Sequence, residues 1–103
     1  MAGHKQPILW SPEARADLFA VWNYYFAEAG EAVADKIVRA LVEKSEMLEL
    51  HPLSGRSRDA LREGIRSVLA DSYIIFYRLQ NGRPEVVRVL HGRQDLEEIF
   101  SKQ

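Results

Sequence analysis

The sequence predicts an α+β fold in which a helical hairpin packs on a mainly antiparallel β-sheet, with residues 1–103 forming a single domain. Two runs rich in β-branched and aromatic residues flank Asn81-Gly82, a pair typical of the tight turn of a β-hairpin. Earlier in the chain, two segments repeat their apolar residues with helical spacing, and only Gly30 interrupts the pattern. These observations place two helices before a meander of strands.

The first elements are expected to be a short strand at residues 7–10 and a helix that begins after Ser11. Ser11 is a favourable N-cap, and Pro12 suits the first helical position, where its missing N–H costs no hydrogen bond. Gly30 should end this helix, because glycine adopts positive φ without steric penalty. The apolar residues of the helix form one stripe, which we expect to face the core: Ala14, Leu18, Val21, Trp22, Tyr25 and Phe26.

The second helix is expected to run antiparallel to the first and to end at His51-Pro52, since the residue before a proline is disfavoured in the α region. Residues 52–59 are predicted to form a loop. Three consecutive antiparallel strands should follow at residues 65–70, 73–79 and 86–90, with a short helix at 96–100. The predicted topology is therefore βααβββ with a short C-terminal helix.

Regular alternation in the last strand would place Val87 and Val89 on one face and Val86, Arg88 and Leu90 on the other. Both faces of the hairpin are partly apolar. One face should therefore pack on the helices, and the other should meet a second cover or a partner.

Composition and spacing exclude several kinds of chemistry. The chain has no cysteine, which excludes disulfides and thiolate catalysis. Its N-terminus does not resemble a signal peptide, and no stretch approaches the roughly 20 apolar residues of a membrane span, so we expect a cytoplasmic protein. The histidines, His4, His51 and His91, lack metal-ligand spacing, and no metal or other cofactor is expected.

Charge is distributed unevenly although the formal net charge is only −1. Residues 54–93 contain eight arginines, no lysine and four acidic residues, so this part of the chain is basic and the remainder is acidic. Arginine favours planar, bidentate contacts with carboxylates and phosphates. The second helix is acidic on its exposed side, which makes it a poor surface for nucleic acid.

Four short motifs stand out along the chain: Trp10-Ser11-Pro12-Glu13-Ala14 followed by Asp17-Leu18, Pro52-x-x-Gly55-Arg56, Tyr73-x-Ile75-x-Tyr77-Arg78, and Val89-Leu90-His91-Gly92-Arg93. Each is weak alone, but their order and spacing resemble the ParE branch of the ParE/RelE toxin superfamily over roughly residues 8–100. The resemblance implies a toxin of a type II toxin–antitoxin system, associated with growth inhibition and plasmid stabilisation. It also implies a hetero-oligomer with a ParD-like antitoxin, whose C-terminal segment wraps the toxin.

Members of this superfamily differ in their targets: the resemblance implies DNA gyrase for ParE-like toxins and ribosome-dependent mRNA cleavage for RelE-like toxins. RNA cleavage through the 2′-hydroxyl requires a base, an acid and cations. RelE-like enzymes carry basic residues on the helix–sheet surface and often a C-terminal tyrosine, whereas this chain has an acidic second helix and only Phe100 after Arg93. His91 is the only obvious proton carrier. We therefore predict a non-enzymatic toxin that inhibits DNA gyrase through protein contacts.

Two other hypotheses stay open. The chain could be a RelE-like mRNA endoribonuclease, with a catalytic set of Arg56, Arg78, His91 and Arg93, or an inactive toxin-fold protein that only binds its antitoxin. The predicted target contacts are Arg58, Tyr73, Arg88, His91 and Arg93. The predicted antitoxin contacts are Trp22, Tyr25, Tyr77 and Arg78.

Overall fold

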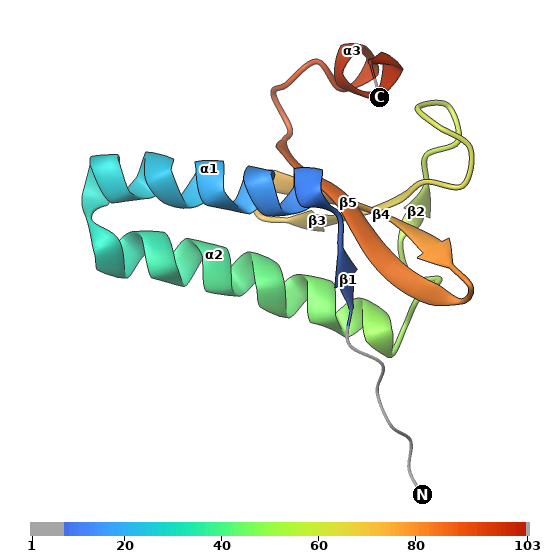
Figure 1. Ribbon diagram of the computed structural model, residues 1–103, viewed down its shortest axis with the longest axis horizontal. Coiled ribbons are helices and arrows are strands. Elements are labelled where there is room, and N and C mark those ends of the chain that lie inside the picture. The colour runs from blue at the N-terminus through green and yellow to red at the C-terminus, as the bar shows by residue number, and fades with distance from the viewer. Residues whose placement is uncertain (1–7, 103) are drawn as a thin grey trace, which may run out of the picture.

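A computed structural model describes residues 8–102 as a helical hairpin and a short C-terminal helix on opposite faces of a five-stranded sheet (Figure 1). The elements are β1 (Leu9–Trp10), α1 (Pro12–Ala29), α2 (Glu31–Glu46), a 3₁₀ turn η1 (Met47–Glu49), β2 (Arg56–Ser57), β3 (Arg66–Ala70), β4 (Tyr73–Gln80), β5 (Arg83–His91) and α3 (Leu96–Ser101). The predicted α+β class is confirmed. Pro7, the first residue of the predicted strand, lies outside the described residues.

The capping residues predicted from the sequence define both ends of α1, the first helix of the hairpin. The Ser11 hydroxyl accepts a hydrogen bond from the Ala14 N–H at 3.0 Å, and Pro12 occupies the first helical position. Gly30 ends α1 with φ of 93° and donates its N–H to the Phe26 carbonyl. α2 ends at Glu46, earlier than predicted, because the chain tightens into η1 before it reaches His51-Pro52.

The sheet has the order β1-β5-β4-β3-β2, with β1 parallel to β5 and all other pairs antiparallel. Asn81 and Gly82 both have positive φ, as a tight hairpin turn requires. β2 was not predicted, because its two residues are too few to show the alternation of apolar and polar side chains that is typical of a strand. Non-local hydrogen bonds hold the chain before it: the Gly55 N–H donates to the Tyr77 hydroxyl, and Arg66 donates to the Gly55 carbonyl.

A β-bulge in the hairpin overturns the predicted alternation of β5. Tyr77 pairs with Val86 and Phe76 pairs with Arg88, so Val87 is the extra residue between the two pairs. Val86 and Val89 consequently share the cluster under the helices, and Val87 lies in the cluster on the opposite face. Regular alternation fails here because pairing with β4, rather than local sequence, decides where the extra residue sits.

Both faces of the sheet are covered. On one face, Ile75 and Val89 pack against the inner residues of the hairpin, among them Val21 and Leu41. On the other, Phe76 packs on Phe100 of α3, with ring centroids 4.8 Å apart. The apolar stripe predicted on the first helix was too wide. The prediction that Phe26 faces the core was wrong.

Two residues of the predicted stripe, Phe26 and Trp22, lie away from the sheet because of the way α1 packs against α2. Phe26 is 50% exposed, and Trp22 is half-buried at the side of α1 that faces α2, where its indole N–H donates to Asp35 at 2.8 Å. Ala14, Leu18, Val21 and Tyr25 point toward the sheet and pack in the core. None of the helices among the described residues is long and apolar enough to span a membrane.

Candidate partner-binding surface

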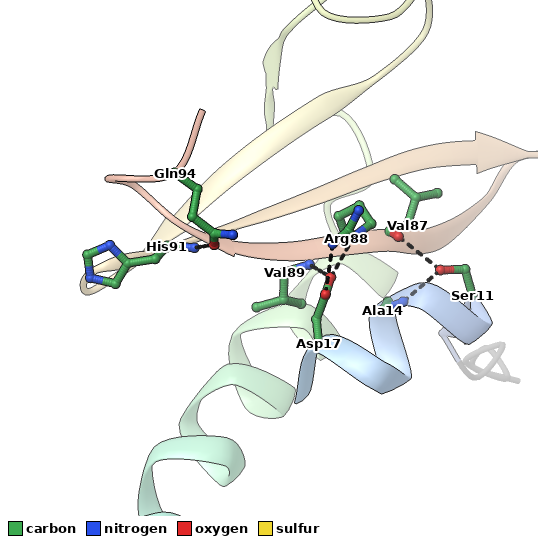
Figure 2. A network of polar contacts seen from close by, with 8 residues as sticks. All are labelled: Ser11, Ala14, Asp17, Val87, Arg88, Val89, His91 and Gln94. Atoms are coloured by element: carbon green, nitrogen blue, oxygen red, sulfur yellow. Dashed lines mark hydrogen bonds and ion pairs between the residues drawn. The ribbon is translucent and has the colours of Figure 1, made fainter. Parts of the chain in front are cut away.

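Beyond the two-residue edge strand β1, the outer side of β5 is closed by side chains of the α1 region (Figure 2). The Ser11 N–H donates to the Val86 carbonyl, and the Ser11 hydroxyl donates to the Val87 carbonyl, both at 2.9 Å. Further along, the Asp17 carboxylate accepts the Val89 N–H at 2.8 Å. Ser11 and Asp17 thus satisfy backbone groups of β5 that a further strand would otherwise pair.

The same Asp17 carboxylate binds the Arg88 guanidinium in a two-point contact. Arg88 Nε donates to Asp17 Oδ2 at 2.8 Å and Nη2 donates to Oδ1 at 3.0 Å. The hydrogen bond to Asp17 raises the pKa of Arg88 above its usual value, although burial opposes this shift. Arg88 is therefore a structural cation that is already neutralised within the fold.

The other edge, at β3, is only partly closed. β2 pairs with Arg66 and Ser67 alone, and within residues 8–102 no strand pairs with the outer side of Val68–Ala70. Leu69 is 70% exposed on this stretch. An adjoining hollow of about 390 Å³ is lined by Lys44, Ser54, Arg56, Arg58, Ser67, Val68 and Leu69. We call this region the open edge; it combines unpaired backbone, apolar surface and positive charge.

An apolar groove continues the open edge toward the helices. It has a volume of about 310 Å³ and is lined by Tyr25, Ile37, Ala40, Leu41, Lys44, Leu69, Ala70, Asp71 and Tyr73. Burial raises the pKa of the Tyr73 hydroxyl to about 12, and its hydrogen bond with Tyr25 adds to the shift. The Tyr73 hydroxyl is thus held neutral as part of the groove wall.

His91 and Arg93 lie at the end of β5. The His91 ring packs edge-on against Tyr73, with centroids 5.3 Å apart, and its Nδ1 accepts the Arg93 N–H at 3.1 Å. The His91 N–H donates to Gln94 Oε1 at 2.7 Å (Figure 2). Because Nδ1 is an acceptor, the neutral ring carries its proton on Nε2, which leaves His91 as a donor at this end of the sheet.

Comparison with known families identifies the chain. Residues 8–96 match the family model described as the ParE toxin of the type II toxin–antitoxin system, parDE. The chain belongs to the ParE toxin family. The predicted resemblance is confirmed, and the match covers nearly all of the described residues.

Relatives with known names agree with the ParE assignment. The chain is similar to Toxin ParE1 of Mycobacterium tuberculosis strain H37Rv, with 36% identity over 90 residues that cover 86% of this chain and 92% of the relative. It is also 36% identical over 86 residues to Toxin ParE1 of Caulobacter vibrioides, covering 84% of this chain and 88% of the relative.

A solved structure has the same fold. The chain resembles a protein of the chromosomal ParDE TA system from P. aeruginosa with a TM-score of 0.75, over 86% of this chain and 98% of the other. Sequence identity is 23%, so this likeness concerns the fold.

Two predicted contact residues of this ParE chain have their polar groups bound within the fold. Tyr77 is fully buried, where its hydroxyl donates to the Pro52 carbonyl and accepts the Gly55 N–H, each at 2.8 Å. Arg88 is bound by Asp17, as described above. Both residues stay predicted contacts, but sequence position alone does not show that the fold already uses their polar groups.

The other three predicted antitoxin contacts lie in three different places. Tyr25 lines the groove and stays a predicted contact. Trp22 faces α2, and Arg78 forms an exposed ion pair with Glu85 at 2.8 Å. Arg78 is five residues from Tyr73 along β4, a separation of roughly 17 Å at about 3.3 Å per residue, so it lies away from the groove.

The predicted target contacts are also spread over the molecule. His91 and Tyr73 are adjacent, and Arg93 is exposed next to them. Arg58 instead packs on the apolar cluster around Phe76, on the face of the sheet that α3 covers. Its guanidinium lies 5.5 Å from the centroid of the Phe76 ring and donates a hydrogen bond to the Ser67 hydroxyl.

The fold does not assemble the four residues of the alternative catalytic set. Arg56 on β2 is separated from His91 on β5 by three strand spacings, about 14 Å at roughly 4.8 Å each. Arg78 lies at the opposite end of β4 from the Tyr73–His91 pair. Among the described residues, no group of three or more histidine and acidic side chains is placed to hold a metal ion; His4 lies outside them.

Two functional features were missed from the sequence. Asp17 closes the β5 edge; the sequence analysis placed it in a ParE-like motif but assigned it no role, although it is the sole charged residue between Arg15 and Glu28. Leu69 is the most exposed large apolar side chain of the open edge, and no periodic pattern distinguishes it from a core leucine.

Proposed function

We propose that this ParE-family toxin inhibits DNA gyrase through protein contacts in the cytoplasm and that a cognate ParD-like antitoxin neutralises it. The observation that carries the non-enzymatic mechanism is the distance of about 14 Å across the sheet between Arg56 and His91. RNA cleavage needs a base, an acid and cations gathered at one phosphodiester, and of the three arginines in the alternative catalytic set only Arg93 lies beside His91. Arg56 and Arg78 are held on other parts of the sheet.

The antitoxin is proposed to occupy the open edge and the groove. An extended segment can add a strand beside Val68–Ala70, where its backbone would pair with unpaired groups of β3. Its apolar side chains would cover Leu69 and enter the groove beside Tyr25. Lys44 and Arg56 favour acidic residues in the same segment. The bound segment is therefore expected to be acidic and apolar.

The target contact is proposed to lie at the end of β5. His91 presents Nε2–H there, and Arg93 is exposed beside it. Both are donors on a scaffold held by β-sheet pairing and by the His91–Gln94 hydrogen bond. The groove that receives the antitoxin shares Tyr73 with this end of the sheet, so an antitoxin bound in the groove would crowd the target contact.

Purified gyrase provides the direct test. Supercoiling and DNA cleavage should be measured beside mRNA cleavage on translating ribosomes, with wild type, His91→Gln and Arg93→Ala. We expect gyrase inhibition by the wild type and little change for His91→Gln, because the glutamine amide can still donate a hydrogen bond. Arg93→Ala should weaken inhibition clearly, since loss of a charged interface anchor can cost several kcal/mol. Arg15→Ala, which changes an exposed arginine on α1, is the matched control.

Two outcomes would contradict the proposal. Ribosome-dependent cuts that fall about 10²–10⁴-fold with His91→Gln, while gyrase is unaffected, would establish the RelE-like ribonuclease mechanism. No effect on either gyrase or ribosomes would favour the inactive antitoxin-binding protein.

A further inference from the structure

The last residue of β5 and the three residues after it, His91-Gly92-Arg93-Gln94, form a turn at the end of the sheet where the target contact is proposed. The Gln94 N–H donates to the His91 carbonyl at 3.1 Å, the hydrogen bond that defines a β-turn. Gly92, Arg93 and Gln94 are exposed, and His91 is half-buried. A short exposed turn is ordinarily among the mobile parts of a protein, because few contacts hold its backbone.

In this turn, however, every backbone N–H has an acceptor. The His91 N–H donates to Gln94 Oε1 at 2.7 Å. The Gly92 N–H donates to the Ser72 carbonyl at 3.1 Å, and the Arg93 N–H donates to Nδ1 of the His91 ring at 3.1 Å. Together with the Gln94 N–H, all the donors of the turn are satisfied, half of them by side chains. The backbone is therefore held in one conformation although it lies at the surface.

Gln94 joins the two ends of the turn twice. Its N–H binds the His91 carbonyl, and its side-chain Oε1 accepts the His91 N–H (Figure 2). The Val89 N–H, two residues earlier, leaves β5 on the same side and is bound by Asp17. Gln94 thus continues the row of side chains that bind the outer side of β5, and it extends this support into the turn.

We propose, on the basis of the target contact described under the proposed function, that Gln94 is a positioning residue: it holds the turn, and through the turn Arg93, in the conformation that binds the target. The Arg93 N–H rests on the His91 ring, and the backbone on both sides of Arg93 is bound by Gln94 and His91. An arginine whose backbone is already ordered loses less conformational entropy when it binds. Gln94 itself makes no contact with the target in this role.

The bond between the His91 ring and Arg93 depends on Gln94 in a specific way. The ring lies edge-on against Tyr73 with centroids 5.3 Å apart, so β4 sets the position of the ring. For Nδ1 to receive the Arg93 N–H, the chain must fold back over the ring, and the Gln94 side chain binds the chain in that fold. Loss of the Gln94 acceptor should therefore release the Arg93 backbone without displacing the ring.

Inhibition of gyrase supercoiling tests whether Gln94 acts through Arg93, using the wild type, Gln94→Met, Arg93→Ala and the double variant. Gln94→Met removes the acceptor and keeps a side chain of similar length, and it should raise the half-inhibitory concentration about three- to tenfold, the range for one hydrogen bond. In the Arg93→Ala background the same change should add less than about twofold, because no anchor is left to position. Gln80→Met, at an exposed glutamine at the far end of β4, is the matched control and should inhibit as the wild type does.

Amide relaxation measured by NMR on the isolated chain tests the turn without gyrase. The Arg93 amide should be as rigid as β5 in the wild type and mobile on the picosecond-to-nanosecond timescale in Gln94→Met. Gln94→Glu should keep the amide rigid, since its carboxylate also accepts the His91 N–H. The urea midpoint of Gln94→Met should equal that of the wild type because the turn is exposed, so a loss of overall stability would not explain weaker inhibition.

The two measurements separate a failure of this inference from a failure of the proposed function. A rigid Arg93 amide in Gln94→Met would overturn the inference, and so would a weakening of gyrase inhibition that is as large with Arg93→Ala as without it. A wild type that leaves gyrase unaffected would contradict the proposed function and, with it, the target role of the turn. The amide data would then still decide whether Gln94 holds Arg93 in place.

Discussion

The two edges of the sheet use polar groups in opposite ways. At β5, Ser11 and Asp17 satisfy the backbone and Asp17 neutralises Arg88, so hydrogen-bonding groups and charge are both consumed within the fold. At β3, the backbone beyond Ser67 has no strand partner among the described residues, Leu69 is exposed, and Lys44 and Arg56 have no ion-pair partner there. The first edge is built for stability and the second is available for binding.

This difference shows why an arginine-rich sequence does not mark its own binding site. Arg88 and Arg56 have the same chemistry, but the first is enclosed by α1 and the second lies on a two-residue strand at the margin of the sheet. Replacing side chains at the closed edge should therefore change the free energy of unfolding. Replacing side chains at the open edge should change the affinity for a partner.

The largest effect is expected for Asp17→Asn. The Asp17 and Arg88 side chains are only 14% and 17% exposed, so loss of the carboxylate leaves a half-enclosed cation and weakens the support of Val89. We expect the free energy of unfolding to fall by about 2–4 kcal/mol, toward the range for breaking a buried ion pair. Urea denaturation measures this change.

Adding Arg88→Met serves as the control for Asp17→Asn. If the cost comes from the stranded cation, the double variant should lose less stability than the sum of the two single variants. A denaturation midpoint for Asp17→Asn equal to that of the wild type would show that the β5 edge does not depend on this carboxylate.

Tyr77→Phe should have the next largest effect, because it removes the support of the chain that leads into the open edge. The buried hydroxyl bonds both Pro52 and Gly55, and its loss leaves a donor and an acceptor unsatisfied, at a cost of about 1–3 kcal/mol. Thermal unfolding should show the loss, and Tyr24→Phe, at an exposed tyrosine, should not. Equal melting temperatures for wild type and Tyr77→Phe would contradict this role.

Tyr73 should make stability depend on alkaline pH. Its pKa is about 12 in the fold against 10.0 for the unperturbed group, so the unfolded chain loses the proton first. The stabilising contribution is fully present below pH 10 and is lost as the pH rises through 12. Tyr73→Phe should lack this part of the decline when unfolding is followed across the same range. Parallel stability curves for the two proteins would show that Tyr73 is not held neutral in the groove.

The smallest effect on stability is expected for Leu69→Ser at the open edge, within about 0.5 kcal/mol because the side chain is exposed. The same change should weaken calorimetric binding of an acidic and apolar antitoxin C-terminal peptide by at least about tenfold. Leu79→Ser, at the far end of β4, is the control that should bind normally. Unchanged affinity with Leu69→Ser would place the antitoxin elsewhere.

The features that depend on interactions between neighbouring residues were predicted correctly. The Asn81-Gly82 turn, the Ser11-Pro12 helix start and the Gly30 helix end each depend on backbone conformations and hydrogen bonds that neighbouring residues specify. The same holds for α3, whose N-cap Asp95 accepts the Glu98 N–H. Together with the ParE-like motifs, these signals were enough for the α+β class and the toxin family.

The sequence by itself determined the order of the helices and most strands, the two ends of α1 and the turn between β4 and β5, because those choices are settled within a few residues. Only the tertiary structure decided that Val87 is a bulge, that Arg56 and Ser57 form β2, and that Asp17 binds Arg88. These features join residues as far as 72 positions apart, as in the Asp17–Val89 bond. Which polar groups remain available to a partner is settled only after such distant groups have found one another.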